Sequence, residues 1–184
     1  QLSSNYISIE KSLLTNHSKI TILRPSLIYG TGEDPLTGGD KKRDRKIWKI
    51  VKFIQKYNYF FVFGSGKTLL QPVHCKDLGE AYYSVLLNKK NTIGKNYDLP
   101  GRNKISYLSM IKTISNYLEK KIIIIHIPIW LSFITVKALN IIPVINISIN
   151  TEQIVRMNED RVFSWQKANK DFSYSPLTFE EGIK

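Results

Sequence analysis

The segment 64-GSGKT-68 has the residue types of a phosphate-binding loop. In such a loop, G-x-x-x-x-G-K-[ST], backbone N–H groups and the lysine surround the phosphates of a nucleotide, and a helix begins at the lysine. Phe61 occupies the position of the first glycine, inside the apolar, strand-like run 59–63. The residues from Lys67 to Pro72 favour an extended chain. The sequence therefore predicts a tight glycine turn between two extended segments, not an ATP site.

The remaining reactive side chains form no recognisable catalytic or metal-binding pattern. Cys75 lacks a His/Asp companion at the spacing of a nucleophilic site, so we expect a small core residue. His74 follows Pro-Val in a predicted strand, where a ring nitrogen commonly bonds to nearby backbone. Asp77 lies at the start of a predicted helix, and we expect it to cap that helix. No metal site is expected, and a single cysteine excludes a disulfide framework.

Length and charge limit the class of protein. The chain has 184 residues, enough for one domain with a core, and 42% of them are hydrophobic. Its net charge of +12 would suit a nucleic acid or an anionic membrane. The basic residues are mostly Lys and are spread along the chain, without an RNA-recognition signature. Nucleic-acid binding is therefore not expected as the main function.

Helices and strands alternate along the sequence, which favours an α/β fold. The predicted helices are 3–16, 41–57, 76–88, 106–119 and 151–168, and the predicted strands are 19–25, 59–63, 96–99 and 121–128. The basic helix 41–57 is expected to lie on the outside of the protein, with a membrane or partner contact as the alternative. The apolar segment 129–149 is interrupted by Lys137 and Pro143, so we expect a buried helix rather than a membrane span.

Five segments, taken in order, carry a resemblance to a known family. They are 22-ILRPSLIYGTGED-34, 62-VFGSGKTLLQPVHCKDLGEA-81, 97-YDLPG-101, 152-EQIVRMNEDRVFSW-165 and 172-FSYSPLTFEEGIK-184. The chain resembles the C-terminal portion of extended, atypical short-chain dehydrogenases of the NAD-dependent epimerase/dehydratase type. The resemblance implies a Rossmann-like, doubly wound parallel sheet that binds NAD or NADP, with a small substrate lobe. It implies one unit over 1–184, with the end of the Rossmann core at 1–30, core strands and the substrate lobe at 31–184, and the glycine-motif half outside the chain.

The resemblance also implies site residues. The candidate cofactor-binding residues, at the strand end where the family's nicotinamide lies, are Arg24, Pro25 and Leu27. The candidate substrate-binding residues are Tyr29, Gln71, His74 and Arg156. Alternatively, Arg156 does not bind substrate but forms an ion pair with an acidic residue on its own helix. Two positions depart from the family: many members carry Asn where this chain has Leu27, and Arg where it has Leu70.

The family's chemistry uses a Tyr-x-x-x-Lys pair on one helix, in which the lysine and the cofactor lower the pKa of the tyrosine. A glutamate commonly follows the lysine by four residues. Glu10 lies fourteen residues before Arg24, as that register requires. The tyrosine and lysine positions are then Leu2 and Tyr6, so the pair is not visible. Tyr6 is kept as a candidate catalytic residue, although Glu10 occupies its lysine position.

Three functions follow. The first is a cytoplasmic, NAD(P)-dependent epimerase or dehydratase-type oxidoreductase that acts on nucleotide sugars, in surface polysaccharide or sugar-nucleotide metabolism. The second is an NAD(P)-binding accessory protein without turnover, as in an accessory subunit of respiratory complex I. The third is a basic peripheral membrane or nucleic-acid-binding module. A peripheral membrane contact and a homodimer stay open.

Overall fold

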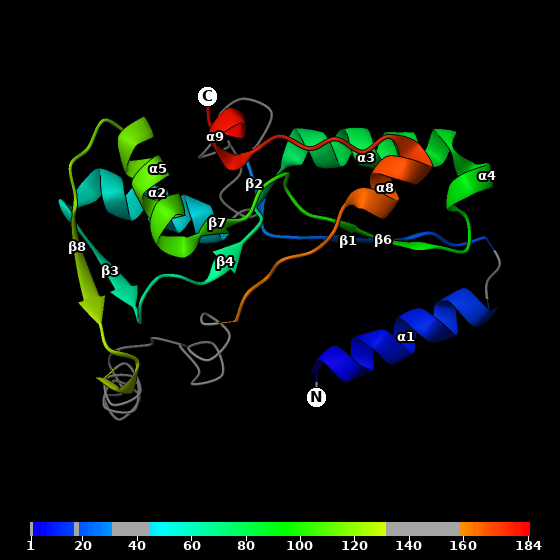
Figure 1. Ribbon diagram of the computed structural model, residues 1–184, viewed down its shortest axis with the longest axis horizontal. Coiled ribbons are helices and arrows are strands. Elements are labelled where there is room, and N and C mark those ends of the chain that lie inside the picture. The colour runs from blue at the N-terminus through cyan, green and yellow to red at the C-terminus, as the bar shows by residue number, and fades with distance from the viewer. Residues whose placement is uncertain (1, 17–18, 31–44, 132–158) are drawn as a thin grey trace.

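A computed structural model describes residues 2–16, 19–30, 45–131 and 159–184. Helices and strands alternate as the sequence predicts (Figure 1). The helices are α1 (Leu2–Asn16), α2 (Arg45–Lys56), α3 (Cys75–Leu87), α4 (Lys89–Thr92), α5 (Tyr107–Tyr117), α8 (Gln166–Phe172) and α9 (Phe179–Gly182). The strands are β1 (Ile22–Pro25), β2 (Ile28–Tyr29), β3 (Tyr59–Phe63), β4 (Leu69–Leu70), β5 (Val73–His74), β6 (Asn96–Leu99), β7 (Ile105–Ser106) and β8 (Ile123–Ile127).

One part of the molecule, the β1–β6 unit, consists of β1, β6, α3 and α8. The two strands run parallel, in register from Ile22 opposite Asn96 to Pro25 opposite Leu99. Figure 1 shows α3 and α8 on one side of this strand pair and α1 on the other. Leu78, Ala81 and Val85 of α3 are buried against the strands at helical spacing. The unit is thus a layered α/β arrangement.

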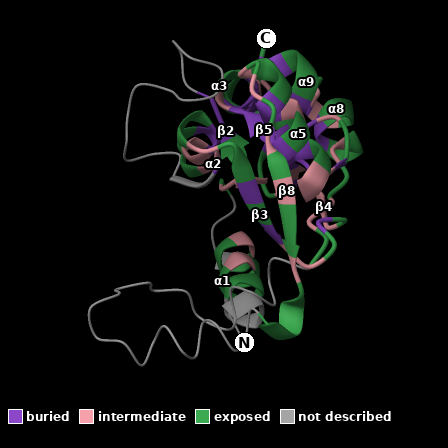
Figure 2. Ribbon diagram, turned by 90° about the vertical axis from the view of Figure 1, so that its left-hand side faces the viewer, coloured by how far each residue is buried: buried purple, intermediate pink, exposed green. Residues whose placement is uncertain are grey.

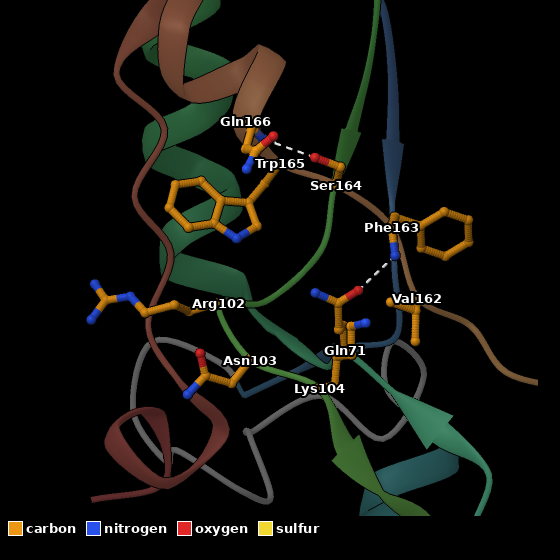
Figure 3. A pocket seen from close by; sticks show the side chains of 9 residues that line it. All are labelled: Gln71, Arg102, Asn103, Lys104, Val162, Phe163, Ser164, Trp165 and Gln166. Atoms are coloured by element: carbon orange, nitrogen blue, oxygen red, sulfur yellow. Dashed lines mark hydrogen bonds between the residues drawn. The ribbon is translucent and has the colours of Figure 1, made fainter.

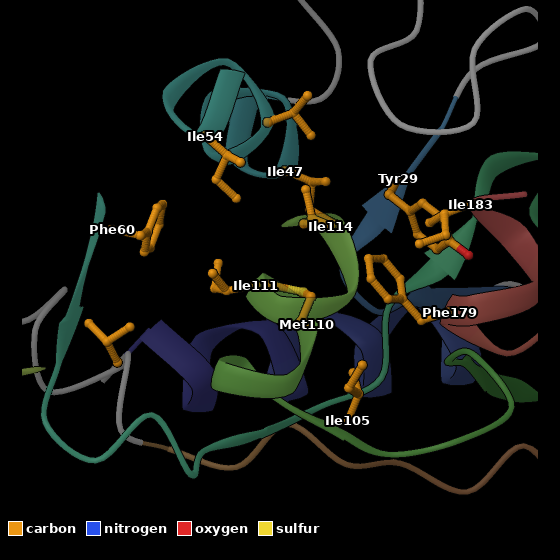
Figure 4. Packing of buried hydrophobic residues seen from close by; sticks show 12 residues of the cluster. Tyr29, Ile47, Ile54, Phe60, Ile105, Met110, Ile111, Ile114, Phe179 and Ile183 are labelled. Carbon is orange, nitrogen blue, oxygen red and sulfur yellow. The ribbon is translucent and has the colours of Figure 1, made fainter. Parts of the chain in front are cut away.

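The second part, the β3–β8 lobe, consists of α2, β3, α5 and β8. Its strands are also parallel, in register from Tyr59 opposite Ile123. Ile47, Val51 and Ile54 of α2 are fully buried, and Figure 4 shows α2, β3 and α5 directing apolar side chains toward one another. The apolar stripe of the predicted helix 41–57 therefore faces the protein core within the described part of that helix. This confirms an outer, packed helix.

Two short strand pairs lie between the β1–β6 unit and the β3–β8 lobe. β2 and β5 are parallel, with Tyr29 opposite His74, and β4 and β7 are antiparallel. Three of the four strand pairs formed by the described residues are therefore parallel, which agrees with the predicted α/β class. Ser106, the last residue of β7, accepts a hydrogen bond on its side chain from Ser109 N and so caps α5 at its N-terminus.

The segment 64–68 forms the predicted glycine turn. Gly64 and Gly66 have φ of 73° and 65°, a left-handed conformation that favours glycine. A Cβ on Gly66 would lie 2.8 Å from Val62 Cγ1, so close packing excludes larger residues as well. No helix begins at Lys67, because β4 follows the turn. The rejection of a phosphate loop is confirmed.

The predicted helix 151–168 is wrong over residues 159–165, which are not helical. Asp160 Oδ1 accepts a hydrogen bond from Leu69 N at 2.8 Å, and Arg161 N donates to Leu69 O at 2.8 Å. These bonds to β4 replace the bonds of a helix. The helix starts later, as α8, and a short terminal helix, α9, follows it.

The apolar segment 129–149 lies mostly outside the described residues, which end at Leu131 before the gap. Among the described helices, none is both long enough and apolar enough to cross a membrane.

Candidate functional site

The candidate cofactor and substrate residues gather where several parallel strands end. In α/β proteins, ligands bind beside the carboxyl ends of such strands. β1 ends at Pro25, and the chain then passes Leu27 into β2, which ends at Tyr29. Val73 N donates to Leu27 O at 2.9 Å, which ties this turn to the strand that ends at His74. The structure thus brings five predicted site residues to the carboxyl ends of these strands: Arg24, Pro25, Leu27, Tyr29 and His74.

Arg24 is held by two carboxylates. Its Nη1 lies 3.4 Å from Glu10 Oε2 on α1, and its Nε lies 3.0 Å from Asp98 Oδ1 on β6. The contact with Glu10 agrees with the register in which this glutamate belongs to the catalytic helix of the family. Because both charges around it are negative, Arg24 is positioned by the protein and is not a free cation. Its role in cofactor binding stays a prediction.

Tyr6 lies one turn before Glu10 on α1, and 64% of it is exposed. It is therefore accessible, on the helix where a catalytic tyrosine is expected. Its lysine position is Glu10, whose carboxylate contacts Arg24, so no lysine at that spacing assists Tyr6. The assignment of Tyr6 as a catalytic residue stays a prediction.

Tyr29 is completely buried. Its ring meets His74 edge-on at 5.2 Å between centroids and Phe179 at 4.9 Å. Its hydroxyl has no hydrogen-bond partner within the described residues, and a Cβ on Gly182 would collide with it. Burial, then the negative charge of Asp77, raises the pKa of Tyr29. A substrate would reach this hydroxyl only after a local rearrangement.

His74 caps α3. Its Nδ1 accepts a hydrogen bond from Lys76 N at 3.3 Å, which agrees with the expected bond between a ring nitrogen and nearby backbone. Its Nε2 is buried and has no partner in the described part of the chain. Burial lowers the pKa of His74, against the opposing effect of the Asp77 charge. The neutral imidazole is therefore favoured.

Asp77 is not the cap that the sequence predicts. Its Oδ2 accepts a hydrogen bond from Leu177 N at 3.0 Å and so anchors the segment before α9. The prediction fails because Asp77 lies within the first turn of α3, whereas the cap position falls on His74. Burial raises the pKa of Asp77, although the bond from Leu177 N opposes this shift.

Gln71 joins three distant segments. Its Nε2 donates to Gly101 O at 3.2 Å, and its Oε1 accepts from Phe163 N at 2.6 Å. It also lines a cavity of about 750 Å³ (Figure 3). The Trp165 indole and Gln71 lie on opposite sides of this cavity in the figure, with Asn103 below. Arg102 and Lys104 add positive charge to its lining.

Sequence reasoning missed this cavity. The signal available was the basic stretch 102-RNK-104 directly after Pro-Gly, together with an aromatic pair, Phe163 and Trp165, more than fifty residues later. Arg156 lies outside the described residues. Within the described ranges, no three His, Cys, Asp or Glu side chains are grouped so as to hold a metal ion.

Comparison with solved structures shows the fold. UDP-glucuronic acid 4-epimerase from Bacillus cereus, determined with UDP-glucuronic acid and NAD, matches 94% of this chain and 47% of its own, with a TM-score of 0.64 and 18% identity. dTDP-glucose 4,6-dehydratase from Bacillus anthracis, determined with NAD, matches 95% of this chain and 45% of its own, with a TM-score of 0.62 and 17% identity. The chain has the Rossmann-like fold of NAD-dependent epimerases and dehydratases, over about half the length of those proteins.

Comparison of the sequence with known proteins identifies a relative that is neither the epimerase nor the dehydratase. Over 92 residues the chain is 29% identical to the mitochondrial NADH dehydrogenase [ubiquinone] 1 alpha subcomplex subunit 9 of Arabidopsis thaliana. The match covers 50% of this chain and 20% of the plant subunit. No protein-family model matches the chain. The fold expected from the resemblance is confirmed.

Proposed function

We propose that the protein is an NAD(P)-dependent oxidoreductase of the epimerase/dehydratase type, with a nucleotide sugar as its substrate. The observation that carries this proposal is a fold match over nearly the whole chain to an epimerase determined with NAD and UDP-glucuronic acid and to a dehydratase determined with NAD. The cofactor would lie beside the end of β1, at Arg24, Pro25 and Leu27.

Two unpaired polar groups support a ligand at this edge. Tyr29 Oη and His74 Nε2 are buried without partners in the described chain, and their rings are in contact. Buried polar groups are nearly always satisfied, so an exception commonly marks a functional site. After the local rearrangement that exposes Tyr29, its hydroxyl can bond to sugar hydroxyls or phosphate oxygens. His74 Nε2 can donate to the same groups, because Nδ1 of the neutral imidazole already accepts from Lys76 N. In this proposal Gln71 orders the adjacent backbone, and Arg156 pairs with a substrate phosphate.

A second candidate function is an NAD(P)-binding accessory protein without turnover. Two observations favour it: Leu2 and Tyr6 stand where the catalytic tyrosine and lysine belong, and the curated relative is a subunit of a respiratory NADH dehydrogenase. In this role the cofactor would stabilise the fold by binding only the native state.

The experiment uses the full-length protein. Mass spectrometry after denaturation identifies any bound dinucleotide, and incubation with UDP- and dTDP-sugars is followed by chromatography of the products. Bound NAD or NADP together with a new sugar product supports the first function. Bound dinucleotide with every sugar unchanged supports the second, and a protein that neither contains nor binds dinucleotide overturns both.

Tyr6→Phe then tests the catalytic candidate. Loss of turnover with unchanged dinucleotide binding would assign the proton transfer to Tyr6, since only its hydroxyl is removed. Unchanged turnover would show that another residue is the general base.

A further inference from the structure

The β3–β8 pair has two apolar faces, but α2 and α5 cover only one of them. Phe60 and Val62 point inward and are buried against these helices. Tyr59, Phe61, Ile123 and Ile125 point the other way, with exposed fractions between 38% and 70%. Figure 2 looks toward this side of the molecule, where much of β8 and part of β3 are coloured as exposed. A strand pair that is polar on its outer face would be ordinary; this one is apolar.

The exposed side chains form one continuous surface, called here the outer β3–β8 face. The parallel register sets Tyr59 beside Ile123 and Phe61 beside Ile125. The rings of Tyr59 and Phe61 meet edge-on at 5.3 Å between centroids. Beyond β8 the chain continues into Ile129, Trp130 and Leu131, which are also exposed. Exposed apolar surface of this extent marks an interaction site.

Basic residues outnumber acidic residues near the ends of the two strands of this face. Segments 45–69 and 120–131, which supply both strands, contain no Asp or Glu. Near the strand ends, Lys67 follows β3, and Lys120 and Lys121 precede β8. The acidic neighbours of these segments include Glu119 and Asp160, and Asp160 accepts a hydrogen bond from Leu69 N. Lys56 Nζ lies 5.2 Å from the centre of the Tyr57 ring, which in turn contacts Tyr59. Cations therefore adjoin the apolar face, and they favour a partner that is both apolar and anionic.

We propose that the outer β3–β8 face is a docking surface for a membrane that contains anionic lipid. Tyrosine and tryptophan favour the boundary between headgroups and acyl chains, and lysines beside them are attracted to anionic headgroups. Ile123 and Ile125 have no flat ring on which a nucleic-acid base would stack, so the aliphatic half of the face favours lipid over RNA. A second copy of the chain would bring like charges together.

The test is sedimentation of the full-length protein with phosphatidylcholine vesicles, with and without phosphatidylglycerol. We expect binding that requires phosphatidylglycerol and weakens as salt is raised. The double substitution Phe61→Thr with Ile123→Thr should reduce the affinity about tenfold or more, because it removes apolar area that would enter the membrane. Both side chains are exposed, so the change leaves the core intact.

A matched control comes from another exposed apolar site. Leu86 and Leu87 on α3 are 60% and 67% exposed and lie outside the proposed face. Leu86→Gln with Leu87→Gln should leave vesicle binding unchanged. For charge, Lys56→Gln with Lys121→Gln should weaken binding and reduce its salt dependence, whereas Lys89→Gln with Lys90→Gln should do neither.

Several results would overturn the proposal. They are equal binding to vesicles without phosphatidylglycerol, equal loss of affinity in the α3 control, and binding to single-stranded RNA in place of vesicles. A dimer in light scattering that Phe61→Thr dissociates would instead assign the face to a second copy. Thermal unfolding of each variant shows that a loss of binding is not a loss of fold.

Discussion

The β3–β8 lobe and the β1–β6 unit have the same design, a parallel strand pair with helices packed on it. Their interiors differ in the share of polar side chains. The lobe's interior is formed mainly by aliphatic and aromatic side chains of α2, α5 and β3, with Ser115 of α5 as a buried polar residue that donates to Lys120 O. The unit also encloses ordered polar groups: Tyr97 Oη donates to Asp171 Oδ2 at 2.7 Å, and Lys95 Nζ lies 2.9 Å from the same oxygen. Thr92 Oγ1 donates to Val85 O at 3.1 Å.

The surface charges differ in the same way. In the unit, Arg24 and Lys95 each have acidic partners, whereas the two segments that contain the strands of the lobe have no acidic residue. The polar contacts of the unit fix the strand end at which the candidate site lies. The lobe depends mainly on packing, and within the described residues α2 and α5 leave its outer β3–β8 face exposed. This difference between the unit and the lobe predicts which substitutions lower the free energy of unfolding and which weaken the binding of a ligand or partner.

The largest effect is expected from truncation in the lobe. Ile111 of α5 is fully buried, and Ile111→Ala should lower the free energy of unfolding by about 2–5 kcal/mol, because it removes packing and leaves a cavity. Ile125→Ala is the control, since this residue faces outward on β8 and should cost much less. Urea denaturation of the full-length variants measures both. Equal losses would show that the outer face is buried in the complete protein.

A smaller effect is expected from a polar truncation in the β1–β6 unit. Tyr97→Phe keeps the buried ring but removes the hydroxyl that donates to Asp171, and it should cost about 1–3 kcal/mol, as for a hydrogen bond to a charged group. The same denaturation experiment applies. No loss in Tyr97→Phe would mean that the unit, like the lobe, depends mainly on packing.

The acid dependence of stability sharpens the comparison further. The hydrogen bond from Tyr97, together with Lys95, holds the pKa of Asp171 below its ordinary value of 3.8. Because the folded-state pKa is the lower one, this contribution is complete above the unfolded pKa and is lost as the pH falls through the folded pKa. Asp171→Asn should therefore remove part of the decline in stability as the pH falls from the ordinary carboxyl pKa of 3.8 through the lower folded-state pKa. An unchanged decline would place the acid sensitivity in other carboxylates.

Local sequence patterns were sufficient to predict the helices that pack on the core through one face. The spacing of Ile47, Val51 and Ile54 predicts both the helix and its buried side, and Ser106 marks the start of α5. Contacts between distant segments were not predictable in this way. Asp160 bonds to Leu69 across 91 positions, and this overrode the helical pattern at 159–165. In the site, the strand-end positions followed from the resemblance. The cavity beside Gln71 combines segments 102–104 and 162–166, and no single local pattern shows that tertiary packing brings them together.

The smallest expected effect on stability distinguishes Tyr29 from Tyr97. Both rings are buried, but only the Tyr97 hydroxyl has partners in the described chain. Tyr29→Phe should leave the free energy of unfolding unchanged or raise it by less than about 1 kcal/mol, because it removes a polar group that folding desolvates without a hydrogen bond.

The same substitution should weaken binding of the nucleotide sugar if the hydroxyl is kept for a ligand, since functional groups are retained at a cost to stability. Calorimetry with the identified sugar nucleotide and urea denaturation of Tyr29→Phe test the two halves separately, with Tyr97→Phe as the matched control. A loss of stability as large as in Tyr97→Phe would mean that Tyr29 Oη has a structural partner. Unchanged stability with unchanged binding would remove Tyr29 from the site and leave His74 Nε2 as the unpaired group to explain.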